Sequence, residues 1–242
     1  MVKAVDWNPW HGCHKKSEGC LHCYVYRHDA RYEKDASLIT KNQSFDLPIK
    51  KNRHHEYIYP SGTLFYTCFT SDFLLEDADL WRIEAWNMMR ERSDCHFLFL
   101  TKRIERLVSV LPADWGDGWS HVSIGCTCEN QIRADERLPI FLALPIKHRS
   151  MVCEPLLGPI DCAKYLKGGI EQIVVGGESG NEARPCHYEW MISLYHQALE
   201  AKVRFYLKQT GANFVKEGKT YHILRRYQRE QAQKAFAAIK KI

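Results

Sequence analysis

Three cysteines lie close together near the start of the chain, within the segment Gly12-Cys13-His14-Lys15-Lys16-Ser17-Glu18-Gly19-Cys20-Leu21-His22-Cys23-Tyr24. Their spacing is C-x6-C-x2-C, just beyond the first expected strand. Nearby cations and a helix N-terminus lower the pKa of a thiol and favour the thiolate, which is the form that binds metals. The pattern therefore indicates that Cys13, Cys20 and Cys23 bind a metal ion or cluster.

Two kinds of metal site suit three thiolates. A structural zinc ion normally takes four protein ligands, so His11, His14 or His22 would have to complete a zinc site. A three-thiolate iron–sulfur cluster instead leaves one iron open to a substrate or cofactor. Thiols without metal, active in redox chemistry, are a third alternative. The iron–sulfur cluster is favoured here, and the other two stay open.

The other seven of the ten cysteines lie mostly inside or beside apolar runs: Cys68, Cys95, Cys126, Cys128, Cys153, Cys162 and Cys186. Free cysteine is a common small core residue, so we expect these seven to pack in the interior. The N-terminus lacks the apolar run of a secretory signal. We therefore expect a reducing, cytoplasmic location in which disulfides are rare.

The elements that must position these groups alternate along the chain. Apolar runs predict seven strands, at residues 3–7, 63–69, 96–100, 121–125, 149–153, 172–175 and 203–207. Helical spacing follows at residues 21–33, 77–91, 103–110, 130–143, 187–200 and 221–241. This alternation predicts an α/β fold, a partial or complete parallel (β/α) barrel related to the TIM barrel, with a flat doubly wound sheet as the alternative. The barrel should occupy residues 1–215, with a surface insertion at about 40–62, and a basic helix should follow at 216–242 and pack on it.

Polar residues follow five of the expected strands, where parallel α/β folds place their sites. They are Thr70, Ser71 and Asp72; Thr101, Lys102 and Arg103; Glu154; Gly176, Gly177, Glu178 and Ser179; and Lys208 and Gln209. Together they predict a polar pocket at the carboxyl ends of the strands. The two glycines should let the backbone approach a ligand or turn with positive φ. The alternative for the charged residues is a salt-bridge network with a structural role only.

The three-cysteine segment, with its preceding Trp7-Asn8-Pro9-Trp10-His11, resembles the opening of a bacterial and phage family of unassigned function that is grouped with radical S-adenosylmethionine enzymes. The resemblance continues, in order, through Phe69-Thr70-Ser71-Asp72-Phe73, Leu100-Thr101-Lys102-Arg103, Cys153-Glu154-Pro155-Leu156-Leu157-Gly158-Pro159, Val175-Gly176-Gly177-Glu178-Ser179-Gly180 and Lys208-Gln209-Thr210-Gly211. It spans residues 6–211 and so covers most of the chain.

This resemblance implies a partial (β/α) barrel in which Cys13, Cys20 and Cys23 hold a 4Fe-4S cluster. The cluster would bind S-adenosylmethionine and, once reduced by an external one-electron donor, cleave it to a 5′-deoxyadenosyl radical that acts on a substrate. In such enzymes the radical chemistry belongs to the cofactor, and the protein supplies positioning and exclusion of water.

Two departures from the wider superfamily affect the residue roles. The superfamily's common cysteine spacing is C-x3-C-x2-C, and its Gly-Gly-Glu element follows the second strand rather than the sixth. By position, Ser71 and Asp72 are then the expected contacts of the methionine amino group, and His22 or Tyr24 would stack on adenine. Gly176, Gly177 and Glu178 would border the ribose or the substrate. The expected substrate or carboxylate contacts are Lys102, Glu154 and Lys208.

Composition limits the function classes. The chain has 242 residues, 45% hydrophobic and 26% charged, which excludes disorder, and its longest apolar runs are far shorter than the roughly 18 residues of a membrane span. Residues 216–242 contain eight basic and two acidic residues and so carry a net charge of +6. The whole chain has a net charge of +5, so residues 1–215 carry a net charge of −1. The basic terminus favours a nucleic acid or nucleotide substrate.

Two other functions compete with the enzyme. One is a non-enzymatic nucleic-acid-binding module stabilised by zinc or an iron–sulfur cluster, although a metal that only stabilises the fold does not require charged residues at separate strand ends. The other, metal-dependent hydrolysis, is disfavoured because hydrolytic barrels use mainly His and carboxylate ligands.

Overall fold

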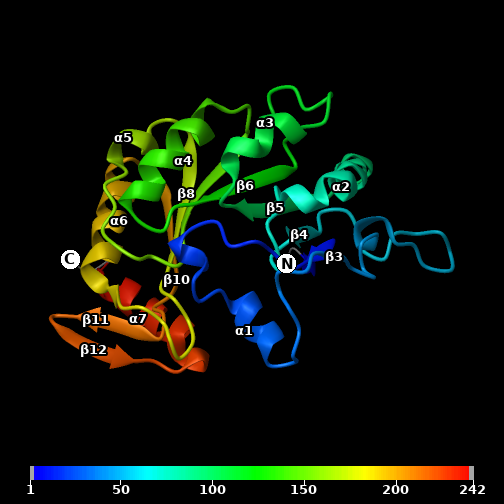
Figure 1. The fold of residues 1–242 in the computed structure, drawn as a ribbon. Coiled ribbons are helices and arrows are strands. Elements are labelled where there is room, and N and C mark those ends of the chain that lie inside the picture. Colours follow the sequence, from blue (N-terminus) through cyan, green and yellow to red (C-terminus); the bar gives the residue numbers. More distant parts are fainter. Residues whose placement is uncertain (1–2, 240–242) are drawn as a thin grey trace. The chain divides into compact units, whose positions relative to one another are not determined.

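The computed structural model describes residues 3–239, which group into two compact units. Unit 1 comprises Met1–Lys16, Val25–Gly125 and Leu144–His148, and unit 2 comprises Ser17–Tyr24, Cys126–Ala143 and Arg149–Ile242. The chain therefore passes between the units within the three-cysteine segment, between Lys16 and Ser17. Strands and helices alternate in both units (Figure 1).

Unit 1 contains the first parallel strands. Their order is β1 (Ala4–Trp7), β4 (Leu64–Thr67), β5 (His96–Thr101) and β6 (Val122–Thr127), whose last two residues belong to unit 2. Strands β1 and β4, and β4 and β5, pair in parallel. The other elements of unit 1 are β2 (Trp10–His11), α1 (Tyr24–Ala30, whose first residue belongs to unit 2), β3 (Thr40–Lys41), η2 (Leu47–Ile49), η3 (Glu76–Ala78), α2 (Asp79–Glu91), η4 (Ile104–Arg106) and α3 (Leu107–Val110).

Alternating side chains explain how these strands form a core. In β5, Phe97 and Phe99 are fully buried, and Leu98 and Leu100, which alternate with them, are more exposed. Phe97 stacks on Phe65 of β4, with ring centroids 5.1 Å apart, and both rings meet the edge of Trp7 in β1. Such aromatic contacts across neighbouring strands hold the carboxyl ends of β1, β4 and β5 in register.

Unit 2 continues the parallel strands with β7 (His148–Cys153), β8 (Ile170–Gly176) and β10 (Arg204–Gln209), and β8 pairs in parallel with both β7 and β10. Helix α6 (Tyr188–Glu200) packs on β8 and β10. Helix α5 (Ala163–Leu166) contacts α6, and α4 (Gln131–Ala143) contacts α5 (Figure 1). A second sheet has the order β12 (Lys219–His222), β11 (Asn213–Lys216) and β9 (Cys186–His187). The remaining elements are η1 (Glu18–Cys20), η5 (Arg225–Tyr227) and α7 (Gln228–Ile239).

The parallel strands confirm the predicted fold class. They follow the order β1-β4-β5-β6 in unit 1 and β6-β7-β8-β10 in unit 2, always ascending along the chain. A doubly wound sheet would reverse its order at a switch point, so that alternative is wrong. The ascending order, with β1 and β10 at its two ends, is that of a partial parallel (β/α) barrel. All seven predicted strands are present.

The predicted helix at residues 221–241 begins later than expected. Residues 213–222 form a hairpin instead, with Glu217 (φ 52°) and Gly218 (φ 74°) at its turn. Positive φ at both central turn residues matches the twist of a two-residue hairpin, which explains the strand β12. Helix α7 starts at Gln228 and packs on β10, where Phe236 contacts Phe205. Residues 240–242 lie outside the described residues.

The segment at 40–62 has little regular structure. Its described elements are β3, η2 and a single bridge between Lys51 and Tyr57. The fully buried Arg92 donates to the carbonyls of Pro48 and Tyr59 and so fixes the segment to the end of α2. Among the helices of residues 3–239, none has both the length and the apolar character needed to cross a membrane.

Candidate functional site

Unit 1 fixes the backbone around Cys13. Gly12 has φ +89°, and a Cβ at this position would lie 2.4 Å from the carbonyl oxygen of Leu38, so only glycine fits. The hydroxyl of Ser71 donates to the Gly12 carbonyl, and the hydroxyl of Tyr26 donates to the Cys13 carbonyl. The structure thus brings the predicted residue Ser71 to the cysteine segment.

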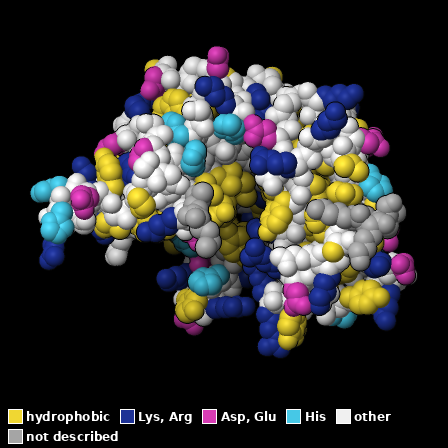
Figure 2. Space-filling model, turned by 180° about the vertical axis from the view of Figure 1, so that it is seen from behind, with side chains coloured by type: hydrophobic (Ala, Val, Ile, Leu, Met, Phe, Trp, Pro, Cys, Tyr) yellow, Lys and Arg dark blue, Asp and Glu magenta, His cyan; other side chains and the backbone are white. Residues whose placement is uncertain are grey.

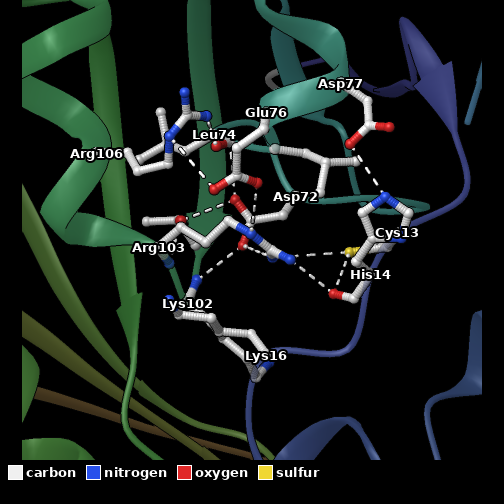
Figure 3. A network of polar contacts seen from close by, with 12 residues as sticks. Cys13, His14, Lys16, Asp72, Leu74, Glu76, Asp77, Lys102, Arg103 and Arg106 are labelled. Atoms are coloured by element: carbon white, nitrogen blue, oxygen red, sulfur yellow. Dashed lines mark hydrogen bonds and ion pairs between the residues drawn. The ribbon is translucent and has the colours of Figure 1, made fainter.

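Asp72 links the ends of β4 and β5 (Figure 3). Its Oδ1 accepts from the Thr101 hydroxyl (2.8 Å) and the Leu74 backbone N–H (2.9 Å), and its Oδ2 accepts from the Lys102 backbone N–H (2.9 Å). The Arg103 guanidinium lies 3.4 Å from the same Oδ2. Both carboxylate oxygens of this buried side chain are therefore engaged by the protein. The contact with a methionine amino group stays a prediction.

Arg103 connects Asp72 to the cysteine segment (Figure 3). The guanidinium is 5% exposed, donates to the His14 carbonyl at 2.7 Å, and lies 3.9 Å from Sγ of Cys13. Burial alone would lower the pKa of Arg103, but Asp72, Cys13 and Glu76 outweigh this effect and raise it. A buried cation beside a thiol favours the thiolate. Sequence reasoning placed Arg103 at a strand end but assigned it no role.

A polar depression of about 610 Å³ lies beside the same strand ends in unit 1. Its lining includes Asn8, His11, Asn42 and Thr70. The ring of His11 is 2.6 Å from the buried carboxylate of Asp29, and the Asn8 side chain accepts from the Thr70 backbone N–H. Two of the lining residues, His11 and Thr70, directly precede Gly12-Cys13 and Ser71-Asp72 in the chain, so the depression lies next to both pairs.

In unit 2, the buried residue Glu129 follows β6 and holds the segment with Cys20 and Cys23. Its Oε1 accepts from the Ser17 hydroxyl, and its Oε2 lies 2.8 Å from the Arg137 guanidinium. A Cβ on Gly19 would lie 2.3 Å from Glu129 Oε1, so this carboxylate packs directly on the backbone of the segment.

Arg184 holds the same segment from a second side. Its guanidinium donates to both carboxylate oxygens of Glu178, at 2.6 and 2.9 Å, and to the Glu18 carbonyl at 3.0 Å. Asn130 and Arg133 bind the Glu18 side chain. The predicted residue Glu178 thus contacts the cysteine segment through Arg184.

The predicted adenine contacts lie in this segment as well. The ring of His22 is 19% exposed and 3.4 Å from the carboxylate of Glu182, and Tyr24 is 54% exposed. Neither side chain is buried in the core, so both stay candidates for stacking on a ligand.

Glu154 and Lys208 also meet in unit 2. The carboxylate accepts from the Lys208 ammonium at 2.7 Å and from the Gln209 amide at 2.6 Å. A Cβ on Gly176 would lie 2.9 Å from Glu154 Oε1, and a Cβ on Gly177 would lie 2.3 Å from the Thr210 carbonyl oxygen. Neither glycine has positive φ, so a turn with positive φ is wrong here, and the close approach of a ligand to the two glycines stays a prediction. Both are needed because neighbouring groups approach them closely.

Burial divides the ten cysteines into two groups. All ten cysteines lie within residues 3–239, and none forms a disulfide. Cys13, Cys20 and Cys23 are half-buried, whereas the other seven are buried, which agrees with the predicted division. Burial raises the pKa of Cys162 and Cys186 to about 12, so these thiols stay protonated. Among residues 3–239, the side chains form no group of three or more His, Cys, Asp or Glu arranged to hold a metal ion.

The fold and these clusters define an α/β protein of the partial-barrel class with charged groups at the carboxyl ends of its strands. The chain belongs to a family described as a protein of unknown function (DUF5131), whose model matches residues 3–238. The comparisons found no curated protein and no solved structure that matches.

Proposed function

We propose that the protein is an iron–sulfur enzyme of the radical S-adenosylmethionine type, with Cys13, Cys20 and Cys23 as the cluster ligands. The observation that carries the proposal is that these three thiols, and no others among the ten, are half-buried, in a segment held by dedicated side chains. A bound 4Fe-4S cluster would supply one electron and an open iron for S-adenosylmethionine.

The protein's own residues would prepare this site. Arg103 places a buried cation 3.9 Å from the Cys13 sulfur, an environment that in general favours a thiolate. Glu129 and Arg184 fix the backbone of the segment with Cys20, so that little ordering is required when the ligands bind. Charged hydrogen bonds of this kind are stronger than neutral ones and hold geometry well.

The remaining roles in the proposal follow the predicted positions. Ser71 and Asp72 would lie near the methionine amino group, His22 or Tyr24 would stack on adenine, and Gly176, Gly177 and Glu178 would border the ribose or substrate. Lys102, Glu154 and Lys208 would contact the substrate, for which we propose a nucleotide or nucleic acid. In this pair the Lys208 ammonium can donate hydrogen bonds to a substrate and the Glu154 carboxylate can accept them.

Anaerobic reconstitution with iron and sulfide tests the ligand assignment. The wild-type protein should bind about four iron ions and show the broad visible absorbance of a cluster, and Cys20→Ala should lose both. Cys186→Ala is the matched control because this cysteine is buried in β9, and it should keep the cluster. Stoichiometric zinc that iron cannot replace would instead support the metal-stabilised binding module.

A further inference from the structure

The C-terminal part of unit 2 carries an exposed basic and aromatic segment, residues 219–229, here called the basic strip. It contains Lys219, Arg225, Arg226 and Arg229 and no acidic residue. Between the cations, Tyr221, Leu224 and Tyr227 are 42%, 62% and 43% exposed. The basic strip therefore places two exposed tyrosines and an exposed leucine among cations.

Both ends of the basic strip are fixed to the body of unit 2. At one end, β12 pairs with β11, and the backbone N–H of Ile223 donates to the Ala212 carbonyl. At the other, Gln228 is 2% exposed, and its carbonyl accepts from the Thr210 backbone N–H. The strip is therefore an ordered surface that need not fold when a ligand binds.

Arg225 links the basic strip to the pair of Glu154 and Lys208 through one intervening side chain. Its guanidinium donates to the Gln209 side chain at 3.2 Å, and the other end of that amide donates to Glu154. Lys208, the ion-pair partner of Glu154, is 49% exposed. On β10, Tyr206 shares the face of Lys208 because the two are two residues apart in a strand, and it is 40% exposed.

We propose that the basic strip binds single-stranded nucleic acid. Cations in a groove or strip neutralise backbone phosphates, and tyrosine rings stack on bases of any sequence. Lys219 lies over the Tyr221 ring, 5.2 Å from its centroid, and Arg226 lies over the Tyr227 ring, 4.8 Å from its centroid. Each cation covers one face of its ring and lies close to where the phosphate of a base stacked on that tyrosine would be. Delivery of a nucleotide from the strip to Glu154 and Lys208 rests on the proposed function, but binding does not.

Fluorescence anisotropy with labelled oligothymidylate, over a series of salt concentrations, tests the proposal on the full chain. The wild-type protein should bind at low salt. The double variant Arg225→Ala with Arg226→Ala should bind more weakly and lower the slope of log affinity against log salt by about 1.4, because each phosphate contact on a single strand contributes about 0.7. Tyr227→Ala should weaken binding about fivefold or more and leave the slope unchanged, since it removes stacking and no charge.

The matched control is Lys164→Ala with Lys167→Ala, which removes the same charge from exposed positions at α5. Lys and Arg side chains also occur elsewhere on the protein surface, as the face in Figure 2 shows, so a general charge effect would weaken both double variants equally. Equal weakening, absence of binding by the wild type at low salt, or stronger binding of polyglutamate than of the oligonucleotide would each overturn the proposal. Binding is measured without S-adenosylmethionine, and Cys20→Ala should bind as the wild type does, so failure here is distinct from failure of the enzyme proposal.

Discussion

The carboxylate of Glu154 lies 2.7 Å from the ammonium of Lys208, although strand β8 separates the strands that carry them. The contact passes over Gly176, the last residue of β8, which leaves room for the Glu154 side chain because it has no side chain of its own. The glycine at position 176 is therefore required by packing against Glu154 and not by an unusual backbone conformation.

Gly176→Ala should break this arrangement. The new Cβ would lie 2.9 to 3.1 Å from three atoms of the Glu154 side chain, so Glu154 would have to leave Lys208 or the strand would have to shift. We expect a loss of about 1 to 3 kcal/mol in the free energy of unfolding, measured by urea denaturation. Gly158→Ala is the control, since its Cβ would meet no atom closer than 3.7 Å, and it should change stability little. Equal effects of the two variants would contradict this account of Gly176.

Arg103→Ala should be more damaging than removal of a surface arginine. It leaves the buried Asp72 carboxylate without its cation, which costs about 3 kcal/mol or more. Arg90→Ala removes a similar Arg–Asp pair whose side chains are 44% and 51% exposed, so it should cost less than about 1 kcal/mol. Thermal and urea unfolding of the two variants measures the difference. Arg103→Lys, which keeps the charge, should recover part of the loss, and no recovery would show that the planar hydrogen bonds matter more than charge.

The pair of Glu178 and Arg184 should make stability depend on pH. Burial would raise the pKa of Glu178, but hydrogen bonds and the charge of Arg184 outweigh it and hold the pKa below its ordinary value of 4.5. A carboxylate with a lowered pKa contributes stability that is full above pH 4.5 and is lost as the pH falls through the lower value.

Glu178→Gln should therefore cost about 2 kcal/mol near pH 6, and the difference from the wild type should shrink below pH 4.5. Denaturant unfolding at a series of pH values measures this difference. A difference that stays constant down to pH 3, well into the range in which folded carboxylates protonate, would contradict the assigned pair.

Thiol alkylation should divide the cysteines into the same two groups as burial does. In metal-free native protein near pH 8, Cys13, Cys20 and Cys23 should react first because they are half-buried. The others should react only on unfolding, since burial raises the pKa of thiols such as Cys162 and Cys186 to about 12. Peptide mass spectrometry after timed labelling reads each site. Early labelling of any buried cysteine would refute the division.

Local patterns in the sequence were sufficient to predict the strands and the division of the cysteines. Runs such as His96 to Leu100 are apolar and aromatic over the length of a strand, and helical spacing between the runs predicts βα units. The hairpin of β11 and β12 was missed because apolar residues from Tyr221 onward also fit helical spacing. Its signal was the Glu217-Gly218 turn, where both residues have positive φ.

The side chains that hold the cysteine segment could not be predicted from one sequence. Glu129 is 112 residues from Ser17 in the chain, and Arg184 is 166 residues from Glu18. A single sequence has no local pattern that reports such pairs, because the fold alone brings them together. The position of Arg103 at a strand end, after Thr101 and Lys102, could be predicted from the sequence. Its contact with Cys13 could not, because that contact depends on the path of the backbone at residues 12–14.

The most direct test of the proposed function is reductive cleavage of S-adenosylmethionine by the reconstituted protein. Under anaerobic conditions and with a strong one-electron reductant, the wild-type protein should produce 5′-deoxyadenosine and methionine in equal amounts, measured by liquid chromatography and mass spectrometry. Cys20→Ala should produce neither, and Cys186→Ala should match the wild type. An intact cluster on the wild-type protein with no 5′-deoxyadenosine above the Cys20→Ala background would contradict the proposal.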